Sequence, residues 1–181
     1  MADEQALLAA LADIRRRGAI GESSLDAAIE HADQFVAALP TEVQRLADLG
    51  SGGGLPGLVI AVRRPALAIT FVERRRSRAD LLQRAVRALR LEQVVVFSGD
   101  VRDLAATQAR SFDVVTARSF AAAPVTARWA GELLITGGVL VVSEPPTPDD
   151  ERWPPSVLAA AGLTDLGPTG GVRRFQRLDG Q

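Results

Sequence analysis

The fold of this chain is decided by Asp48-Leu49-Gly50-Ser51-Gly52-Gly53-Gly54-Leu55-Pro56-Gly57. The stretch joins a short apolar run, Leu46 to Leu49, to an apolar segment from Pro56 to Val62, which predicts a strand, a tight turn and a helix that begins with proline. Glycines at alternate positions allow a sharp bend and leave main-chain amides open to a ligand that side chains would otherwise shield. The turn therefore predicts a site for a nucleotide-like ligand.

Strands and helices alternate along the rest of the chain, which is typical of a doubly wound α/β sheet. The strands expected to be parallel are apolar without internal alternation, as buried strands require, and cover residues 46–49, 68–72, 94–97, 112–115 and 139–142. The helices expected among and after them cover 56–62, 77–91, 122–134 and 155–161. Two further runs, 163–166 and 172–175, flank Gly167-Pro168-Thr169-Gly170-Gly171 and predict a C-terminal antiparallel hairpin, which completes a mostly parallel seven-stranded sheet.

Two helices are expected ahead of the sheet. One face of the first carries Leu7, Leu8, Leu11 and Ile14, and the second, capped by Ser23 or Ser24, carries Leu25, Ile29, Phe35 and Val36. Pro40 closes this helical segment. We therefore expect a single domain over residues 1–181, with a helical N-terminal part at 1–40 and a Rossmann-like core at 41–181.

The composition argues against several kinds of site. The chain has no cysteine and one histidine, His31, so we expect no disulfide and no metal centre. No stretch approaches the roughly 20 apolar residues of a membrane span, and the first residues are acidic, so we expect a cytoplasmic protein without membrane contact, and a monomer. The net charge is −1 and every basic residue is an arginine, so contact with nucleic acid would rest on local clusters such as Arg74-Arg75-Arg76.

Asp48 helps to choose between two ligands for the turn. Gly52-x-Gly54-x-x-Gly57 also fits the dinucleotide fingerprint, so the glycines alone leave a nicotinamide cofactor open. A carboxylate just before the first glycine would repel a pyrophosphate, but it can accept a charge-assisted hydrogen bond from the ammonium of an amino-acid ligand, which favours S-adenosylmethionine. Glu73 ends the second strand, where an acid receives ribose hydroxyls with either cofactor. The alternative for both residues is a solvated carboxylate at a strand end.

A third acidic residue, Asp100, follows the third strand at the same edge of the sheet, where an adenine ring would lie. The backbone amides of Val101 or Arg102 could then read the ring. The alternative is a helix cap, in which the Asp100 side chain accepts from the amide of Asp103.

These segments together resemble the RsmG (GidB) family, and the resemblance spans roughly Gly18 to Val142. Three motifs occur in the family's order. Asp48 to Gly57 is similar to the family's Asp-x-Gly-Ser-Gly-x-Gly-Phe-Pro-Gly, Val115-Thr116-Ala117-Arg118-Ser119 to its Val-Thr-x-Arg-Ala, and His31-Ala32-Asp33-Gln34-Phe35 to its His-x-x-Asp-Ser-Leu.

The resemblance implies a Rossmann-like class I methyltransferase that uses S-adenosylmethionine to methylate guanine N7 in 16S ribosomal RNA, with that RNA or the small ribosomal subunit as partner. Arg118 would lie beside the methionine moiety or the target nucleotide and is the candidate catalytic residue; a salt bridge to Asp48 or Glu73 is the alternative. Guanine N7 carries a free lone pair, so no general base is needed. The residues expected to line the cofactor pocket are Asp48, Gly50, Ser51, Gly52, Gly54, Leu55, Glu73, Asp100, Val101, Arg102 and Arg118.

Some positions depart from the family pattern. Glu144 stands where the family tends to have a lysine, Ser77-Arg78 stand where it has paired lysines, and no Trp-Asn…Asn-Leu-Thr segment precedes Gly18. We therefore expect an abbreviated RNA-facing part and an inverted charge near the substrate. Phe120 and Trp153 are the aromatic candidates for stacking on a base, and the alternative for each is packing. For His31, the alternative to a catalytic role is also packing.

Three other functions remain open from the sequence. A methyltransferase of the same ancestry could act on a small molecule or a protein, or the chain could bind S-adenosylmethionine without catalysis. An oxidoreductase that binds NAD is disfavoured by Asp48.

Overall fold

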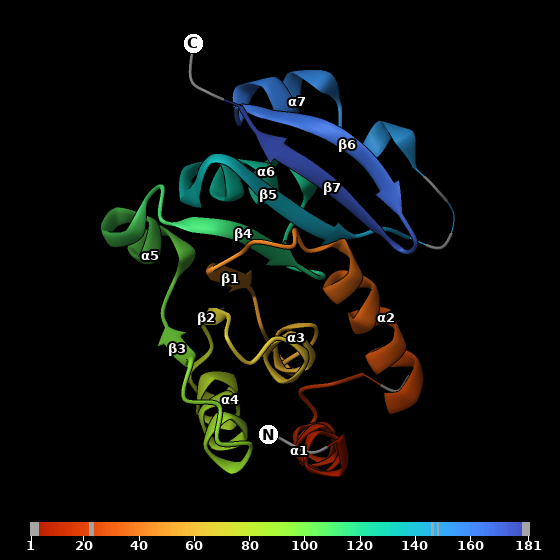
Figure 1. Ribbon diagram of the computed structural model, residues 1–181, viewed down its shortest axis with the longest axis vertical. Coiled ribbons are helices and arrows are strands. Elements are labelled where there is room, and N and C mark those ends of the chain that lie inside the picture. The colour runs from red at the N-terminus through yellow and green to blue at the C-terminus, as the bar shows by residue number, and fades with distance from the viewer. Residues whose placement is uncertain (1–3, 22–23, 146, 148, 179–181) are drawn as a thin grey trace.

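A mixed sheet of seven strands forms the centre of the structure, a computed structural model that describes residues 4–21, 24–145, 147 and 149–178. The strand order is β3-β2-β1-β4-β5-β7-β6 (Figure 1). Strands β1 to β5 run parallel, and β7 runs antiparallel between β5 and β6, which confirms the doubly wound sheet and its C-terminal hairpin. The strands are β1 (Arg45–Leu49), β2 (Ala68–Glu73), β3 (Val94–Ser98), β4 (Phe112–Ala117), β5 (Leu134–Ser143), β6 (Leu163–Thr169) and β7 (Val172–Arg177).

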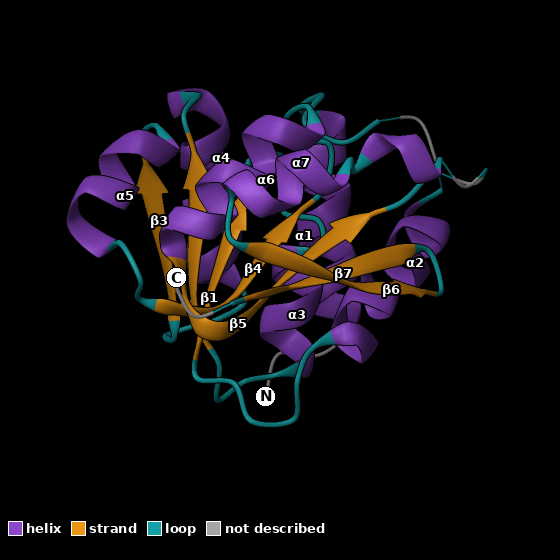
Figure 2. Ribbon diagram, turned by 90° about the horizontal axis from the view of Figure 1, so that it is seen from above, coloured by secondary structure: helices purple, strands orange, loops and turns teal. Residues whose placement is uncertain are grey.

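Helices cover both faces of the sheet (Figure 2). One face packs against α1 (Glu4–Arg16), α2 (Leu25–Ala38), α3 (Gly57–Arg63) and α4 (Arg76–Ala88). The other packs against α5 (Val101–Gln108), α6 (Ala123–Leu133) and α7 (Pro155–Ala160). Successive strand residues such as Val114 and Val115 belong to these two separate cores. Burial on both faces explains why the strands show no alternation of apolar and polar residues.

The described residues contain one α-helix, α5, and one short 3-10 helix (Asp150–Arg152) that the sequence pattern did not predict. Helix α5 crosses between β3 and β4, and it buries Val101 and Leu104 only three positions apart. So short an apolar pattern gives little helical periodicity. Its N-terminus is marked instead by Asp100, which caps the helix by accepting from the amide of Arg102 at 3.0 Å rather than from that of Asp103.

Other elements lie where they were expected, with shifted ends. Helix α2 begins after Ser24, whose hydroxyl accepts from the amide of Ala27 at 3.1 Å; Ser23, the other candidate cap, lies outside the described residues. The helix ends at Ala38, two residues before Pro40. Strand β5 begins at Leu134, because α6 ends at Leu133 and the chain enters the sheet directly.

The N-terminal helices are tied to the core by ion pairs as well as by packing. Arg63, in α3, donates to the carboxylate of Glu4 in α1 and, at 3.2 Å, to that of Asp33 in α2. The segment between these two helices also reaches the glycine turn, since a Cβ added to Gly53 would overlap Ile20 and lie 2.6 Å from the carbonyl oxygen of Ala19. The helical N-terminal part therefore packs against the turn that was expected to hold the ligand.

None of the described helices is long and apolar enough to cross a membrane. Within the described part of the chain, no three His, Cys, Asp or Glu side chains are grouped so that they could hold a metal ion.

Replacing Gly57 by alanine tests how closely the turn packs. A Cβ at this position would overlap the ring of Phe71 and lie 2.8 Å from Oδ2 of Asp48, and Phe71 is fully buried. We expect Gly57→Ala to lower the free energy of unfolding by about 1–3 kcal/mol, measured by urea denaturation. Gly21→Ala is the control, because nothing lies within 4 Å of a Cβ there. Equal stabilities of the two variants would contradict this prediction.

Candidate functional site

Three adjoining cavities lie at the carboxyl ends of the parallel strands, around the place where the strand order reverses between β1 and β4. The Glu73 cavity has a volume of about 450 Å³ and is lined by Gly50, Glu73, Asp100, Phe120 and Trp129, among others. The Leu55 cavity, about 280 Å³, is lined by Ile20, Ser51, Gly52, Leu55 and Arg118, among others. The Glu144 cavity, about 700 Å³, is lined by His31, Arg118, Ser143, Glu144 and Arg152, among others. Ser119 borders all three, so they adjoin one another, and together they are called the cleft below.

The glycine turn joins the first two cavities. Gly50 has a φ of +66° and packs under Phe120, since a Cβ there would lie 2.9 Å from Cδ2 of that ring. The amides of Gly50 and Ser51 both donate to the carbonyl of Val72, which pins the turn to β2. A side chain at Gly50 would require both strain in the backbone and displacement of Phe120.

Glu73 is held in place by the backbone on either side of it. Its Oε2 accepts from the amide of Gly52 at 3.0 Å and its Oε1 from the amide of Arg75 at 2.7 Å. The residue is 5% exposed and still lines the cavity. Each carboxylate oxygen keeps a free lone pair, so the group can accept from the two hydroxyls of a ribose.

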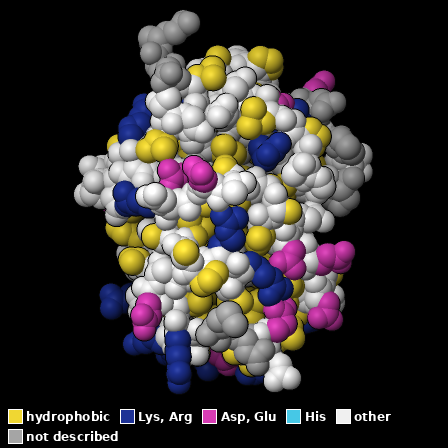
Figure 3. All heavy atoms as spheres, in the orientation of Figure 1, with side chains coloured by type: hydrophobic (Ala, Val, Ile, Leu, Met, Phe, Trp, Pro, Cys, Tyr) yellow, Lys and Arg dark blue, Asp and Glu magenta, His cyan; other side chains and the backbone are white. Residues whose placement is uncertain are grey.

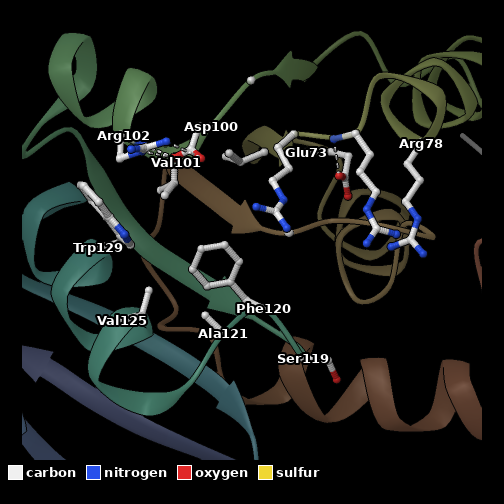
Figure 4. A pocket seen from close by; sticks show the side chains of 15 residues that line it. Glu73, Arg78, Asp100, Val101, Arg102, Ser119, Phe120, Ala121, Val125 and Trp129 are labelled. Atoms are coloured by element: carbon white, nitrogen blue, oxygen red, sulfur yellow. Dashed lines mark hydrogen bonds and ion pairs between the residues drawn. The ribbon is translucent and has the colours of Figure 1, made fainter.

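The Glu73 cavity combines apolar and carboxylate side chains in its lining. In Figure 4 the ring of Phe120 lies between Glu73 and Arg78 on one side and Asp100, Val101 and Trp129 on the other. Trp129 and Val101 supply an apolar wall for a base, and Glu73 supplies acceptors for a sugar. Asp100 is both a helix cap and part of the lining, and it also pairs with Arg102 at 3.0 Å.

Asp48 lies beneath the turn, on the side of α3. It is 1% exposed; its Oδ1 accepts from the hydroxyl of Thr116 at 2.7 Å, and its Oδ2 has no hydrogen-bond partner among the described groups. Burial raises the pKa of Asp48 to about 6, against the opposing influence of the Thr116 and Ser51 hydroxyls and of the Arg118 charge. An unsatisfied carboxylate oxygen beside the turn fits a cationic ligand group such as an ammonium. That Asp48 receives the ammonium stays a prediction.

Arg118 follows β4 and borders both the Leu55 cavity and the Glu144 cavity. The side chain is half-buried and forms no hydrogen bond or ion pair with any residue that the structure describes, so the alternative salt bridge to Asp48 or Glu73 is not formed. Burial lowers the pKa of Arg118, and the charge of Asp48 opposes this shift. A half-buried guanidinium without partners is suited to bind an anionic or carbonyl group of a ligand.

From the sequence, Glu144 was expected to bring an inverted charge near the substrate, and in the structure this charge is paired. Glu144 is not a lone negative charge, because its Oε1 accepts from Arg152 at 3.0 Å and from the indole of Trp153 at 3.1 Å. Trp153 is buried against Phe175, so it packs rather than stacks on a ligand. The His31 ring stands edge-on to Phe35 in the wall of the Glu144 cavity. Burial and, to a smaller extent, the charge of Arg118 lower the pKa of His31, which favours the neutral ring.

Most of the predicted site residues are brought together in this cleft. The Glu73 cavity collects Gly50, Glu73, Asp100, Val101 and Arg102, and the Leu55 cavity collects Gly50, Ser51, Gly52, Leu55 and Arg118. Asp48 and Gly54 line none of the three cavities. Gly54 instead leaves space for Leu58, because a Cβ at position 54 would overlap that side chain. Its role in the turn is therefore to allow close packing.

Sequence reasoning missed several residues of the lining. Val125 and Trp129 lie one turn apart on α6, a spacing that usually indicates core packing rather than a site. The arginines that follow β2, namely Arg74, Arg75 and Arg78, form part of the Glu73 cavity, although their cluster was read only as a possible basic patch. The segment Ala19 to Gly21 carries no motif, and nothing in the sequence indicated that it would wall the Leu55 cavity.

Comparisons with known proteins identify the family that this chain resembles. The model of the GidB family, described as rRNA small subunit methyltransferase G, matches residues 29–152. A ribosomal RNA small subunit methyltransferase G from Acidiphilium cryptum is 42% identical over 106 residues, which cover 59% of this chain and 47% of that protein. A protein of the same name from Neisseria meningitidis is 39% identical over 139 residues, which cover 76% of this chain and 59% of that protein. The chain thus spans about half the length of the curated relatives that it matches.

Solved structures support the fold. An O-methyltransferase family protein from Burkholderia thailandensis superposes with a TM-score of 0.65 over 86% of this chain and 59% of its own, at 19% identity. At that identity the likeness concerns the fold alone, which is that of the Rossmann-like methyltransferases.

Replacing Asp48 by asparagine tests how the buried carboxylate affects stability. Its pKa of about 6, raised from 3.8, means that the folded protein holds this proton more tightly than the unfolded chain. The resulting stabilisation is present below about pH 4 and is lost as the pH rises through about 6. In ligand-free protein, we expect Asp48→Asn to change the free energy of unfolding more favourably at pH 8 than at pH 4. The two changes should differ by on the order of 2–3 kcal/mol. Urea denaturation at both pH values measures this, and an equal effect at both would contradict it.

Proposed function

Because the chain belongs to the GidB family of rRNA small subunit methyltransferase G proteins, we propose that it transfers a methyl group from S-adenosylmethionine to N7 of a guanine in 16S ribosomal RNA. The observation that carries the proposal is the cleft, in which the Glu73 cavity, the Leu55 cavity and the Glu144 cavity all meet at Ser119, with Arg118 lining the last two. Such a cleft has room for a methyl donor at one end and an acceptor base at the other.

The residues present fit S-adenosylmethionine. Glu73 would hold the ribose, the wall of Val101 and Trp129 would face the adenine, and the Leu55 cavity would take the methionine part, with Asp48 nearby. When bound, the cofactor supplies an activated methyl group.

Guanine N7 suits this cleft as the acceptor atom because it carries a lone pair at neutral pH and loses no proton on methylation. The protein then has to position two reactants rather than remove a proton. Arg118, at the junction of the cavities, would orient the acceptor by donating to a carbonyl or phosphate oxygen of the nucleotide. His31 faces the same cavity with a lowered pKa and is not required as a base.

Contact with RNA would be local. On the face seen in Figure 3, arginine and acidic side chains are interspersed, in keeping with the net charge of −1. At the cleft, however, the guanidinium groups of Arg74, Arg75 and Arg78 make no hydrogen bond to the described residues and are available to phosphates. Phosphate contacts of this kind hold the backbone in register, while specificity comes from the base itself.

Methyl transfer to purified small ribosomal subunits tests the proposal. With radiolabelled S-adenosylmethionine, we expect the wild-type protein to label 16S RNA and Arg118→Ala to lower the rate by about 100-fold or more, the size of effect seen when a positioned donor is lost. Arg16→Ala is the control, since Arg16 is an exposed arginine on α1 whose partner is Asp13.

The outcomes separate the competing functions. Labelling of no RNA would reject the proposal and leave a small-molecule or protein acceptor, or a protein that binds the cofactor without catalysis. Labelling that Arg118→Ala does not reduce would show that this side chain has no part in transfer.

Binding of S-adenosylhomocysteine tests the cofactor site separately. Two backbone amides donate to the Glu73 carboxylate, and a glutamine offers one acceptor atom to them and to the ribose. We therefore expect Glu73→Gln to weaken binding by about tenfold or more in titration calorimetry, while the exposed Glu42→Gln leaves it unchanged. Binding of NADH in place of S-adenosylhomocysteine would contradict a methyltransferase site.

A further inference from the structure

Glu144 is the most firmly positioned charged side chain of the acceptor-side cavity. Its side chain is 10% exposed, and Oε1 accepts from both the Arg152 guanidinium at 3.0 Å and the Trp153 indole at 3.1 Å. Arg152 is fixed in turn, because it donates to the carbonyl of Ser143 at 2.8 Å and its guanidinium carbon lies 5.4 Å from the centre of the Trp153 ring. Trp153 is buried against Phe175 of β7. The carboxylate is thus anchored to the core.

The other oxygen of this carboxylate is not used by the protein. Oε2 accepts no hydrogen bond from the residues that the structure describes, and Glu144 lines the cavity together with Arg118 and His31. An ionised carboxylate oxygen accepts hydrogen bonds and cannot donate them. The cavity therefore presents a fixed acceptor at Glu144, in addition to the carboxylate of Asp149, while Arg118 in its lining presents only donors.

Of the four RNA bases, guanine alone has a Watson–Crick edge that carries two adjacent donors, N1–H and the N2 amino group, beside a carbonyl acceptor, O6. Adenine places the N1 acceptor at the same point, where it would meet Oε2 with like polarity. A buried site that leaves such a polar group unpaired discriminates strongly against the wrong partner. Guanine N7 lies on the edge opposite N2, so a base read through N1 and N2 leaves N7 free.

Resting on the proposed function, we propose that Glu144 is the residue that selects guanine as the acceptor base. Oε2 accepts from N1–H and the N2 amino group, while Arg118 donates to O6, and N7 then faces the end of the cleft where the methyl donor binds. Glu144, which departs from the lysine pattern of the family, is on this reading a specificity residue of this chain rather than a misplaced charge.

Glutamine at position 144 offers a sharp test because the surrounding donors fix its orientation. Arg152 and Trp153 both donate to the Oε1 position, so the amide oxygen of Glu144→Gln has to lie there. The amide nitrogen then occupies the position of Oε2 and presents donors instead of an acceptor. The variant keeps the anchor and inverts the polarity that the base meets.

The experiment is titration calorimetry with five-nucleotide RNAs that carry a central guanosine, inosine or adenosine among uridines. Saturating S-adenosylhomocysteine fills the cofactor site beforehand. For the wild type we expect guanosine to bind roughly 10- to 100-fold more tightly than adenosine, with inosine, which lacks the N2 amino group, in between. Glu144→Gln should reduce or reverse this preference, and the exposed Glu92→Gln should preserve it.

The control measurements are the melting temperature and the affinity for S-adenosylhomocysteine, both of which Glu144→Gln should leave unchanged. If Glu144 only anchors the chain after β5, the variant will keep the guanosine preference, and the inference is overturned. Absence of saturable guanosine binding to the wild type overturns it as well.

The two proposals fail in distinguishable ways. A guanosine preference that depends on Glu144, without methylation of 16S RNA, would reject the proposed reaction and keep the specificity residue. If the wild type methylates 16S RNA but Glu144→Gln does not change its base preference, the proposed reaction stands and the role of Glu144 in specificity is rejected.

Discussion

Four segments pack against the glycine turn after β1 so closely that a side chain on the turn would displace one of them. Phe120 covers Gly50, Ala19 and Ile20 meet Gly53, Leu58 fills the space beside Gly54, and Phe71 lies against Gly57. The same turn is tied to β2 through the carbonyl of Val72 and the carboxylate of Glu73. Because these contacts come from both sides of β1, the turn fixes where the sheet, the N-terminal helices and the cleft lie relative to one another.

The fold was predictable from the sequence because its strongest signals are local. The apolar runs and the glycine turn predicted the order of strands and helices, and the glycine-rich turn near residue 170 predicted the hairpin. Helix α5 was missed because two buried residues, Val101 and Leu104, make too weak a pattern. The lining of the site was harder to predict, because Trp129 and Ile20 reach it through packing between distant segments, which no single stretch of sequence records.

Several polar groups in or beside the cleft have an atom that no described residue pairs with. Asp48 holds an unsatisfied oxygen, Arg118 makes no pair with its described surroundings, and Glu144 uses one oxygen of two. Elsewhere, Arg173 pairs with Asp165, although the buried Nε atoms of Arg174 and Arg177 also have no hydrogen-bond partner among the described groups. Open polar groups that gather at one edge of the sheet reduce the stability of the empty protein, and this is the usual condition of a binding site.

The hydrogen bond between Gln34 in α2 and the amide of Gly171, 2.8 Å long, joins the beginning of the chain to its last hairpin. The cleft likewise draws its walls from residues as far apart as Ala19 and Arg152. During synthesis, therefore, the complete cleft cannot form before the chain has emerged as far as Arg152. Because the cleft joins segments so far apart in the sequence, a bound ligand stabilises all of these segments together.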